Sequence, residues 1–267
     1  MKVFVCIKQV PGVSEVKIDP KTNTLVREGI PSIINPMDKN GVQLALDIKR
    51  EYGAETIAVS MGPPQAEEAI REAIAMGIDK GYLLTDRAFA GADTLATSHT
   101  LALGIKHLLK GLDGDEKYLI ICGTQAIDGD TAQVGPELAE ELGIPQITYV
   151  KDFKLEGNKM IVQRAFRPEE VVEIETKLPA LISVLNDINE PKYPRMDGVV
   201  NAYTKEITYL NHEDIDAEKK NVGLNGSMTE VWKIFVPKRK GEHLILEGTI
   251  NEQVEQLCDN LKEDKIF

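Results

Sequence analysis

The first two-thirds of the chain repeats one pattern, in which a short apolar run is followed by a loop and then by an amphipathic segment. The apolar runs predict buried strands at Val3–Ile7, Thr56–Ser60, Tyr82–Thr85, Tyr118–Cys122 and Gln146–Val150. Apolar side chains at helical spacing predict helices over residues 39–52, 66–74, 93–110 and 131–142. A glycine suited to a left-handed helix end follows three of these helices, at Gly53, Gly77 and Gly143.

Continuous apolar strands that alternate with helices are typical of a parallel sheet covered by helices on both faces. Because crossover connections between parallel strands are right-handed, the predicted fold class is α/β, with a doubly wound and mostly parallel sheet. After residue 150 the pattern changes. Strands predicted at Phe153–Leu155 and Met160–Arg164 flank a hairpin-turn sequence, and further strands are predicted at Val171–Glu175 and Leu181–Leu185. We therefore expect antiparallel additions to the sheet.

The rest of the chain is polar from about residue 186 to residue 226 and contains several prolines and glycines. Such a stretch is either an extended arm that lies on a partner or a flexible linker. Apolar positions from Ile250 onward predict a short terminal helix. The expected organisation is a nucleotide-binding α/β domain at residues 1–185, followed at 186–267 by a partner-recognition loop, an extended arm and a C-terminal helix.

The composition argues against several classes of function. The net charge of −12 argues against nucleic acid binding, which needs a basic surface. No apolar run approaches the roughly 20 residues that cross a bilayer, and the N-terminal apolar run is too short for a signal peptide. We therefore expect a cytoplasmic protein without membrane insertion. The three cysteines lack metal-binding spacing, so neither a disulfide framework nor a metal site is predicted.

In an open α/β sheet, ligands bind beyond the carboxyl ends of the strands. The segment 123–135 is the most informative one there, because it leaves a buried strand and enters a predicted helix. Gly129 permits close backbone approach, Asp130 or Thr131 can cap the helix, and the first-turn amides at 132–134 suit a phosphate or pyrophosphate. A capped helix start without a ligand remains the alternative. No catalytic residue is predicted, since phosphate-loop, nucleophile and metalloprotease motifs are absent and no histidine lies near a plausible nucleophile.

Several motifs, in order, resemble the small (beta) subunit of electron-transfer flavoproteins. They are Val5-Cys6-Ile7-Lys8-Gln9-Val10, Asn35-Pro36-Met37-Asp38, Ala75-Met76-Gly77-Ile78-Asp79, Gln125-Ala126-Ile127-Asp128 and Asn189-Glu190-Pro191-Lys192-Tyr193. The resemblance runs over residues 1–200. It implies a fold like that of adenine-nucleotide alpha-hydrolases and a heterodimer with a larger alpha subunit that carries another FAD.

The resemblance also implies a cofactor site. Its contacts fall on Cys6, Lys8, Asn35, Pro36, Met37, Asp38, Met61, Gly123, Gln125, Asp128, Thr131, Ala132, Gln133 and Val134, with Asp93 and Thr94 as weaker candidates. In plain electron-carrier members this site holds structural AMP, and in electron-bifurcating members it holds FAD. The sequence at 128–136 looks like the bifurcating branch, and the small Gly129 and Ala132 leave room for a pyrophosphate. FAD is therefore expected, with AMP as the alternative.

For the bifurcating branch, the resemblance implies that NADH supplies electrons, one passing to a low-potential acceptor such as ferredoxin and one to the alpha subunit and an acyl-CoA or 2-hydroxy-acid dehydrogenase. The flavin would carry this chemistry, so Asp38 is expected to act on it electrostatically. The dehydrogenase is expected to bind Ile188, Asn189, Glu190 and Pro191, with an exposed Ile188 as the anchor; packing of Ile188 under its own loop is the alternative. The Arg167–Glu170 stretch replaces the family's usual Gly-Gly turn. An ATP-binding protein of the same broad fold is a further alternative.

Overall fold

The computed structural model describes residues 1–12, 32–110, 117–167, 170–232, 245–264 and 266. The chain divides into two compact units, Met1–Trp232 and Lys233–Phe267.

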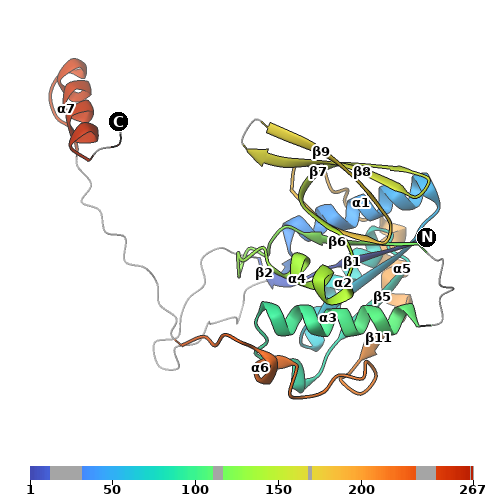
Figure 1. Ribbon diagram of the computed structural model, residues 1–267. Helices are drawn as coiled ribbons and strands as arrows, with labels where there is room; N and C mark the ends of the chain where they lie inside the picture. Colours follow the sequence, from blue (N-terminus) through green and yellow to red (C-terminus); the bar gives the residue numbers. More distant parts are fainter. Residues whose placement is uncertain (13–31, 111–116, 168–169, 233–244, 265, 267) are drawn as a thin grey trace. The chain divides into compact units, whose positions relative to one another are not determined.

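A nine-stranded sheet forms the centre of the first unit (Figure 1), with the strand order β11-β5-β4-β1-β6-β10-β7-β8-β9. Its strands are β1 (Lys2–Cys6), β4 (Glu55–Met61), β5 (Lys80–Leu84), β6 (Tyr118–Gly123), β7 (Gln146–Glu156), β8 (Lys159–Arg167), β9 (Glu170–Lys177), β10 (Ala180–Val184) and β11 (Ile207–Leu210). Pairing is parallel from β11 to β7 and antiparallel from β7 to β9. A separate antiparallel pair is formed by β2 (Gln9–Pro11) and β3 (Ser32–Ile34).

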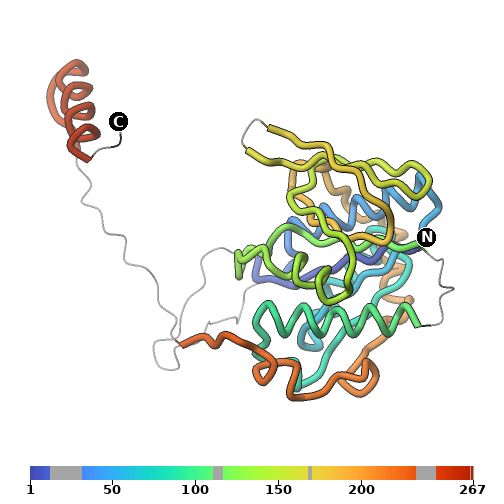
Figure 2. Tube along the Cα trace, in the orientation of Figure 1, coloured from blue at the N-terminus to red at the C-terminus, as the bar shows by residue number. Residues whose placement is uncertain are grey.

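Helices cover both faces of the parallel strands (Figures 1 and 2). The helices on one face are α1 (Pro36–Tyr52), α2 (Glu67–Met76) and α5 (Met196–Thr204), and those on the other are α3 (Thr94–Leu109) and α4 (Val134–Leu142). Successive side chains of a strand point to opposite faces, so Val3 and Val5 enter the core under α1, while Phe4 enters the core under α3. The doubly wound parallel sheet and its antiparallel additions are confirmed.

The glycines after the helices end them as predicted. Gly53 and Gly143 adopt left-handed φ values of 67° and 65° at the ends of α1 and α4. Gly157, in the two-residue turn between β7 and β8, has a φ of 63°. Residues 168 and 169, in the stretch that departs from the Gly-Gly turn, lie outside the described residues.

The prediction of an extended arm at 186–226 is wrong. Within it, α5 packs on α2, and β11 adds a parallel edge strand beside β5. A short helix, α6 (Gly223–Gly226), packs near the start of α3. Residues 186–232 therefore belong to the same compact unit as the sheet, and the chain divides after Trp232, not after residue 185.

The start of α4 also differs from the prediction. The helix begins at Val134, not at residue 131, and its N-cap residue Gln133 makes no side-chain capping bond. The preceding loop holds two non-glycine residues at left-handed φ values of 56°, Asp130 and Ala132. Neither Asp130 nor Thr131 therefore caps this helix.

The second unit contains the predicted terminal helix, α7 (Ile250–Glu263). It begins with a capping box, in which the Thr249 side chain and the Glu252 side chain each bond the other residue's backbone N–H. Its apolar side chains, such as Val254 and Leu257, are exposed within this unit. In the part of the chain that the structure describes, no helix has both the length and the apolar composition to span a membrane.

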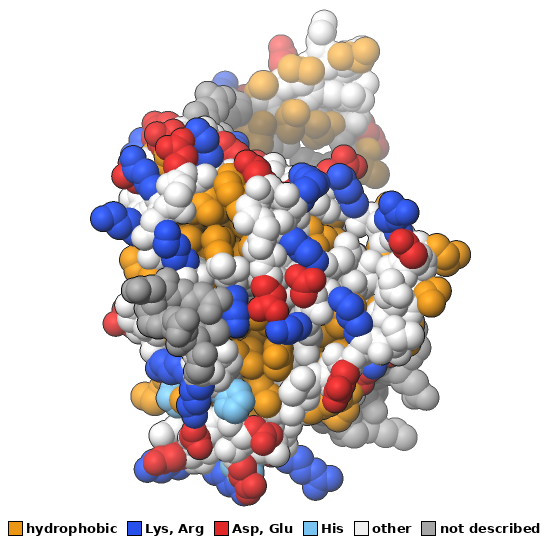
Figure 3. All heavy atoms as spheres, turned by 90° about the vertical axis from the view of Figure 1, so that its right-hand side faces the viewer, with side chains coloured by type: hydrophobic (Ala, Val, Ile, Leu, Met, Phe, Trp, Pro, Cys, Tyr) orange, Lys and Arg blue, Asp and Glu red, His pale blue; other side chains and the backbone are white. Residues whose placement is uncertain are grey.

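The face seen in Figure 3 carries basic and acidic side chains interspersed with apolar ones, and no continuous basic patch is visible there. Ion pairs at the amino ends of the strands follow the same mixed pattern, because Lys2 and Lys80 both pair with Glu55. On this face the described side chains form no basic stripe of the kind that nucleic acid binding needs.

Candidate nucleotide-binding site

The carboxyl ends of the parallel strands bring most of the predicted cofactor residues to one edge of the sheet. Lys8 follows β1, Met61 ends β4, Gly123 ends β6, and Asp93 lies in the connection after β5. The first residues of α1 meet the same edge, because this helix runs antiparallel to the strand that it precedes. This is the edge at which doubly wound sheets bind ligands.

Asp38 lies at the centre of this edge and points into the protein. Its Oδ2 accepts a hydrogen bond of 2.8 Å from the backbone N–H of Lys8, and its Oδ1 accepts one of 3.0 Å from the Asn35 side chain. The backbone N–H of Gly123 also donates to this carboxylate. One buried side chain therefore joins the ends of β1 and β6 to the first turn of α1.

Burial raises the pKa of Asp38 from 3.8 to about 7. The hydrogen bonds from Asn35, Lys8 and Gly123, and the positive charge of Lys8, lower the pKa in part and do not cancel the effect of burial. The carboxylate faces these internal donors and so shapes the edge, and the electrostatic action of Asp38 on a flavin stays a prediction.

Asn35 is fully buried and holds the loop that follows β6. Its side-chain N–H donates to the carbonyl of Gln125 at 2.9 Å, and its side-chain oxygen accepts from the backbone N–H of Ile127 at 3.1 Å. The loop is also tied to β10, because the amide and hydroxyl of Thr124 both donate to the Val184 carbonyl. Hydrogen bonds to Asn35 and to β10 therefore fix the path of residues 124–127.

The following residues present free backbone N–H groups. Ala132 is left-handed, with a φ of 56°, and Gln133 is right-handed, with φ −98° and ψ −34°. Consecutive residues of opposite hand turn successive N–H groups toward one side and form an anion-binding nest. Among the described residues, none accepts a hydrogen bond from the amides of residues 131–135. The nest and the first turn of α4 thus retain their donors for an anion.

Gly129 lies beside this nest in open space. A Cβ placed there would meet no heavy atom of the described residues within 4 Å, and its φ is not left-handed. Nothing in the folded chain itself therefore requires glycine at this position.

Lys8 and Asp128, both predicted cofactor contacts, bind each other. The Lys8 ammonium donates to both carboxylate oxygens of Asp128, at 2.7 and 2.8 Å, across the top of the edge. The side chain of Gln125 donates to Asp130 in the same loop. The Lys8 charge is thus held over the edge while its backbone bonds Asp38.

The remaining predicted cofactor contacts, Cys6, Pro36, Met37 and Met61, differ in how exposed their side chains are at the edge. The Cys6 thiol points into the core and contacts Cys122, and the hydrogen bond between the two thiols, together with burial, raises the pKa of Cys122. Only the backbone of Cys6 can therefore contribute to the edge. Pro36 is exposed, whereas Met37 and Met61 are half-buried.

Asp93 and Thr94 lie at the start of α3 with their side chains engaged within the protein. Asp93 caps the helix by accepting from the Ala96 amide at 3.0 Å. The Thr94 hydroxyl lies 3.2 Å from a carboxylate oxygen of Glu137, in the first turn of α4. The structure brings these two residues beside the nest but aims neither side chain into it.

The predicted partner-binding residues lie in the loop after β10, which contacts α1 at Asn40. Asn189 and Asn40 exchange hydrogen bonds, at 3.0 Å from Asn189 to the Asn40 carbonyl and at 2.8 Å in return, which fixes the loop against the helix. The expected exposure of Ile188 is wrong, because its side chain is half-buried and packs against the core. The exposed apolar side chains come slightly later, at Tyr193 (95%) and Met196 (81%).

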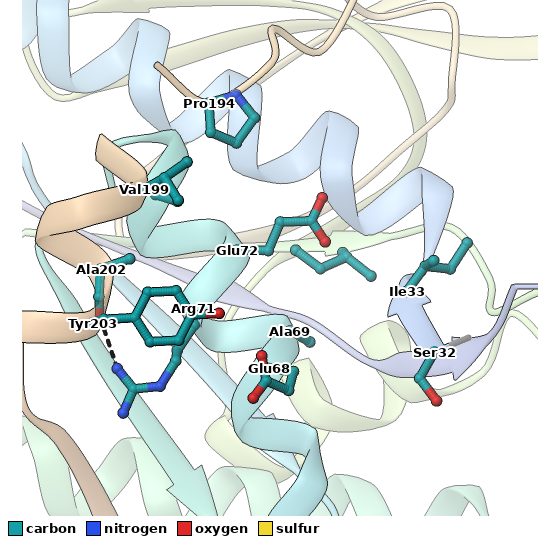
Figure 4. A pocket seen from close by; sticks show the side chains of 12 residues that line it. Ser32, Ile33, Glu68, Ala69, Arg71, Glu72, Pro194, Val199, Ala202 and Tyr203 are labelled. Atoms are coloured by element: carbon teal, nitrogen blue, oxygen red, sulfur yellow. Dashed lines mark hydrogen bonds between the residues drawn. The ribbon is translucent and has the colours of Figure 1, made fainter. Parts of the chain in front are cut away.

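Two adjoining cavities lie beside this loop. One, of about 600 Å³, is lined by Asn189, Glu190 and Pro191 together with residues of α1 and α2. The other, of about 270 Å³, lies between β3, α2 and α5 and is shown in Figure 4. There Arg71 donates to the Ala202 carbonyl at 2.7 Å and lies 5.4 Å from the centre of the Tyr203 ring.

Sequence reasoning missed the residues that support the site from behind. Ser98 is fully buried and lies 3.1 Å from Glu137, so α3 holds the first turn of α4. The free amide of Gly135 was missed because the helix was expected to start earlier. Met196 was missed because residues 186–226 read as an irregular arm. The sequence did offer a signal for these contacts. Thr94 and Ser98 lie near the start of α3, and the acidic Glu137 lies in the first turn of α4.

The fold and this edge define a doubly wound α/β protein with a nest of backbone N–H groups at the carboxyl ends of its strands. Comparison with known proteins makes the assignment more specific. The family model for the electron transfer flavoprotein domain matches residues 22–215. The chain belongs to the electron transfer flavoprotein family, among its beta subunits.

Several relatives align over nearly the whole length of both chains. The electron transfer flavoprotein subunit beta of Clostridium acetobutylicum is 48% identical, with 99% of each chain covered. The caffeyl-CoA reductase-Etf complex subunit CarD of Acetobacterium woodii is 50% identical, with 100% of each chain covered. The acryloyl-CoA reductase electron transfer subunit gamma of Anaerotignum propionicum is 41% identical, again with 100% of each covered.

Proposed function

We propose that this beta subunit binds FAD at the carboxyl edge of its sheet. With an alpha subunit, it would bifurcate electrons from NADH to a low-potential acceptor such as ferredoxin and to a partner dehydrogenase. The observation that carries the cofactor proposal is the nest at 131–135, whose free amides suit the pyrophosphate of a dinucleotide. When bound, FAD would supply both one-electron and two-electron chemistry.

The residues around the nest fit FAD. The open space at Gly129 and the small side chain of Ala132 leave room for an extended ligand beside the amides. The likeness to CarD, a subunit of a caffeyl-CoA reductase-Etf complex, supports the bifurcating branch. AMP is the alternative ligand, because its single phosphate would also fit a nest.

The chain's own residues would bind and orient the cofactor and need not transfer protons. Asn35 and Asp38 would hold the surrounding backbone, and the amides of 131–135 would bind phosphate oxygens. The Lys8 ammonium, now paired with Asp128, lies close enough to the edge to add positive charge when the pair opens.

The partner dehydrogenase would dock on the loop after β10. The bonds from Asn40 to Asn189, and from the Lys192 amide to the Gln43 side chain at 3.0 Å, hold this loop before any partner binds. A preordered loop loses little entropy on docking. Its exposed apolar groups, Tyr193 and Met196, are better placed as anchors than the half-buried Ile188. The chemistry of the relatives favours an acyl-CoA dehydrogenase as the partner.

Coupled electron delivery tests this function. The beta subunit is purified with its alpha subunit and mixed with NADH, oxidised ferredoxin and the partner dehydrogenase. We expect ferredoxin reduction only when the dehydrogenase and its unsaturated CoA-ester substrate are both present. Delivery of electrons to the dehydrogenase without any ferredoxin reduction would assign the chain to the plain electron carriers.

A further inference from the structure

Asp93 forms hydrogen bonds with a segment that lies far away in the sequence, residues 227–229. Its Oδ2 accepts from the amides of Met228 and Thr229, each at 2.9 Å, and from the Thr229 hydroxyl at 3.0 Å. Its own backbone N–H donates to the Ser227 hydroxyl at 2.8 Å. The Met228 side chain is 82% exposed. Hydrogen bonds to Asp93, and not burial, therefore hold Met228 and Thr229, whereas the half-buried Ser227 also donates from its hydroxyl to the Gly223 carbonyl at 2.8 Å.

The next residue, Thr94, holds α4. Its hydroxyl lies 3.2 Å from one carboxylate oxygen of Glu137 and 3.4 Å from the side-chain oxygen of Gln133. The other carboxylate oxygen of Glu137 lies 3.1 Å from the Ser98 hydroxyl. Gln133 makes no capping bond of its own, so the contacts with α3 help to set where the first turn of α4 lies, together with the packing of the buried Gly135 on the sheet.

Resting on the proposed function, we infer that Asp93 and Thr94 link residues 227–229 to the cofactor nest. The two residues are the N-cap and the first residue of α3, so they share one turn of backbone. A displacement of residues 227–229 would shift this turn, and Thr94 would pass the shift to Glu137 and the amides of 131–135. Both are positioning residues, and cofactor affinity would depend on a segment that does not touch the cofactor.

Hydrogen exchange in the ligand-free chain tests the link. In Asp93→Asn, the asparagine can still cap α3 but places an N–H₂ group near the amides of 228 and 229. We expect faster exchange both at 227–232 and at 137–142, where the amides of α4 are hydrogen-bonded. Thr94→Val should speed exchange at 137–142 only, and Thr94→Ser should restore the wild-type rate there.

Asp86→Asn is the matched control. Asp86 caps the short helix η2 (Arg87–Phe89) and holds another distant residue, His212, but it has no described hydrogen bond to α4. This variant should leave exchange at 137–142 unchanged. Thr229→Val, which removes a single bond to Asp93, is a milder variant should Asp93→Asn fold poorly, and the same two regions should respond to a smaller degree.

FAD affinity provides the second readout. Asp93→Asn and Thr94→Val should each weaken FAD binding by roughly three- to tenfold, as expected for coupling through a packed network. Faster exchange at 227–232 with unchanged exchange at 137–142 in both Asp93→Asn and Thr229→Val would overturn the link. If the wild-type chain bound neither FAD nor AMP, the proposed function would fail, and the exchange data would still decide the coupling.

Discussion

The carboxylate of Asp38 occupies the space in which a side chain on Gly123 would begin. A Cβ at residue 123 would lie 2.8 Å from the Asp38 backbone nitrogen and 2.9 Å from the Met37 carbonyl carbon, closer than real contacts of this kind. The glycine is therefore required so that α1 can meet the end of β6. This close approach allows one carboxylate to join the two elements.

Gly123→Ala should consequently destabilise the fold, because the new methyl group meets backbone that cannot move aside. We expect a loss of roughly 1–3 kcal/mol in the free energy of unfolding, measured by urea denaturation. Gly129→Ala is the matched variant, since open space surrounds that residue. It should leave stability within about 0.5 kcal/mol of wild type and weaken FAD binding. Equal stability of the two variants would contradict this account of Gly123.

The raised pKa of Asp38 predicts a pH dependence of stability. Between pH 4 and 7 the folded chain keeps a proton that the unfolded chain has lost, so the free energy of unfolding should fall as pH rises through this range. The contribution is complete below the ordinary pKa of 3.8 and is lost by about pH 7, with an upper size of roughly 4 kcal/mol. Asp86, whose pKa the Ala88 amide lowers to about 2, titrates below this window.

Urea denaturation at pH 5 and pH 7.5 measures the slope. Asp38→Asn should be less stable at both values, because an amide N–H₂ would face the donors that now bond the carboxylate. Its stability should nevertheless vary less with pH than that of wild type. A wild-type slope no steeper than the variant's would show that Asp38 does not titrate in this range.

A charge placed in the nest should expel the cofactor. In Ala132→Glu a carboxylate would meet the phosphate oxygens that the free amides are proposed to bind, so nucleotide content should drop sharply. Ala132→Gln is the control of equal size without charge and should retain much more nucleotide. Ala132→Gly, which suits the left-handed φ of 56°, should fold at least as stably as wild type. Equal nucleotide content in the Glu and Gln variants would argue against an anion at this place.

In the region proposed to bind the dehydrogenase, Ile188 and Met196 should affect different properties, stability and partner binding. Ile188→Ala should cost roughly 1–2 kcal/mol of stability, because its half-buried side chain packs on the core. Met196→Ala should leave stability unchanged and weaken dehydrogenase binding by roughly 1–2 kcal/mol. Denaturation and a binding titration on both variants measure the two effects. The reverse assignment, with binding lost only in Ile188→Ala, would restore Ile188 as the anchor.

The central sheet could be predicted because buried parallel strands are continuous apolar runs. Among the elements that escaped prediction, α5 and β11 did so for a physical reason. β11 buries only Ile207 and Leu210 at the sheet edge, and α5 buries only Ala202, so neither carries a clear periodic signal. Their structure comes from packing on β5 and α2, which a local pattern does not reveal.

At the site, the residue types were predictable and their orientations were not. Asp130 and Thr131 are good N-cap types, yet the left-handed Ala132 delays the helix until Val134. Asp38 was expected at the edge, but only the structure shows that it faces inward, toward donors from three separate segments.

The nucleotide content of the purified heterodimer tests the central claim most directly. The beta subunit and its alpha subunit are purified together, denatured, and their released nucleotides are separated and quantified. The account predicts two FAD for each heterodimer and no AMP, and it predicts that Ala132→Glu in the beta subunit lowers this to one FAD. One FAD and one AMP in the wild-type heterodimer would contradict it.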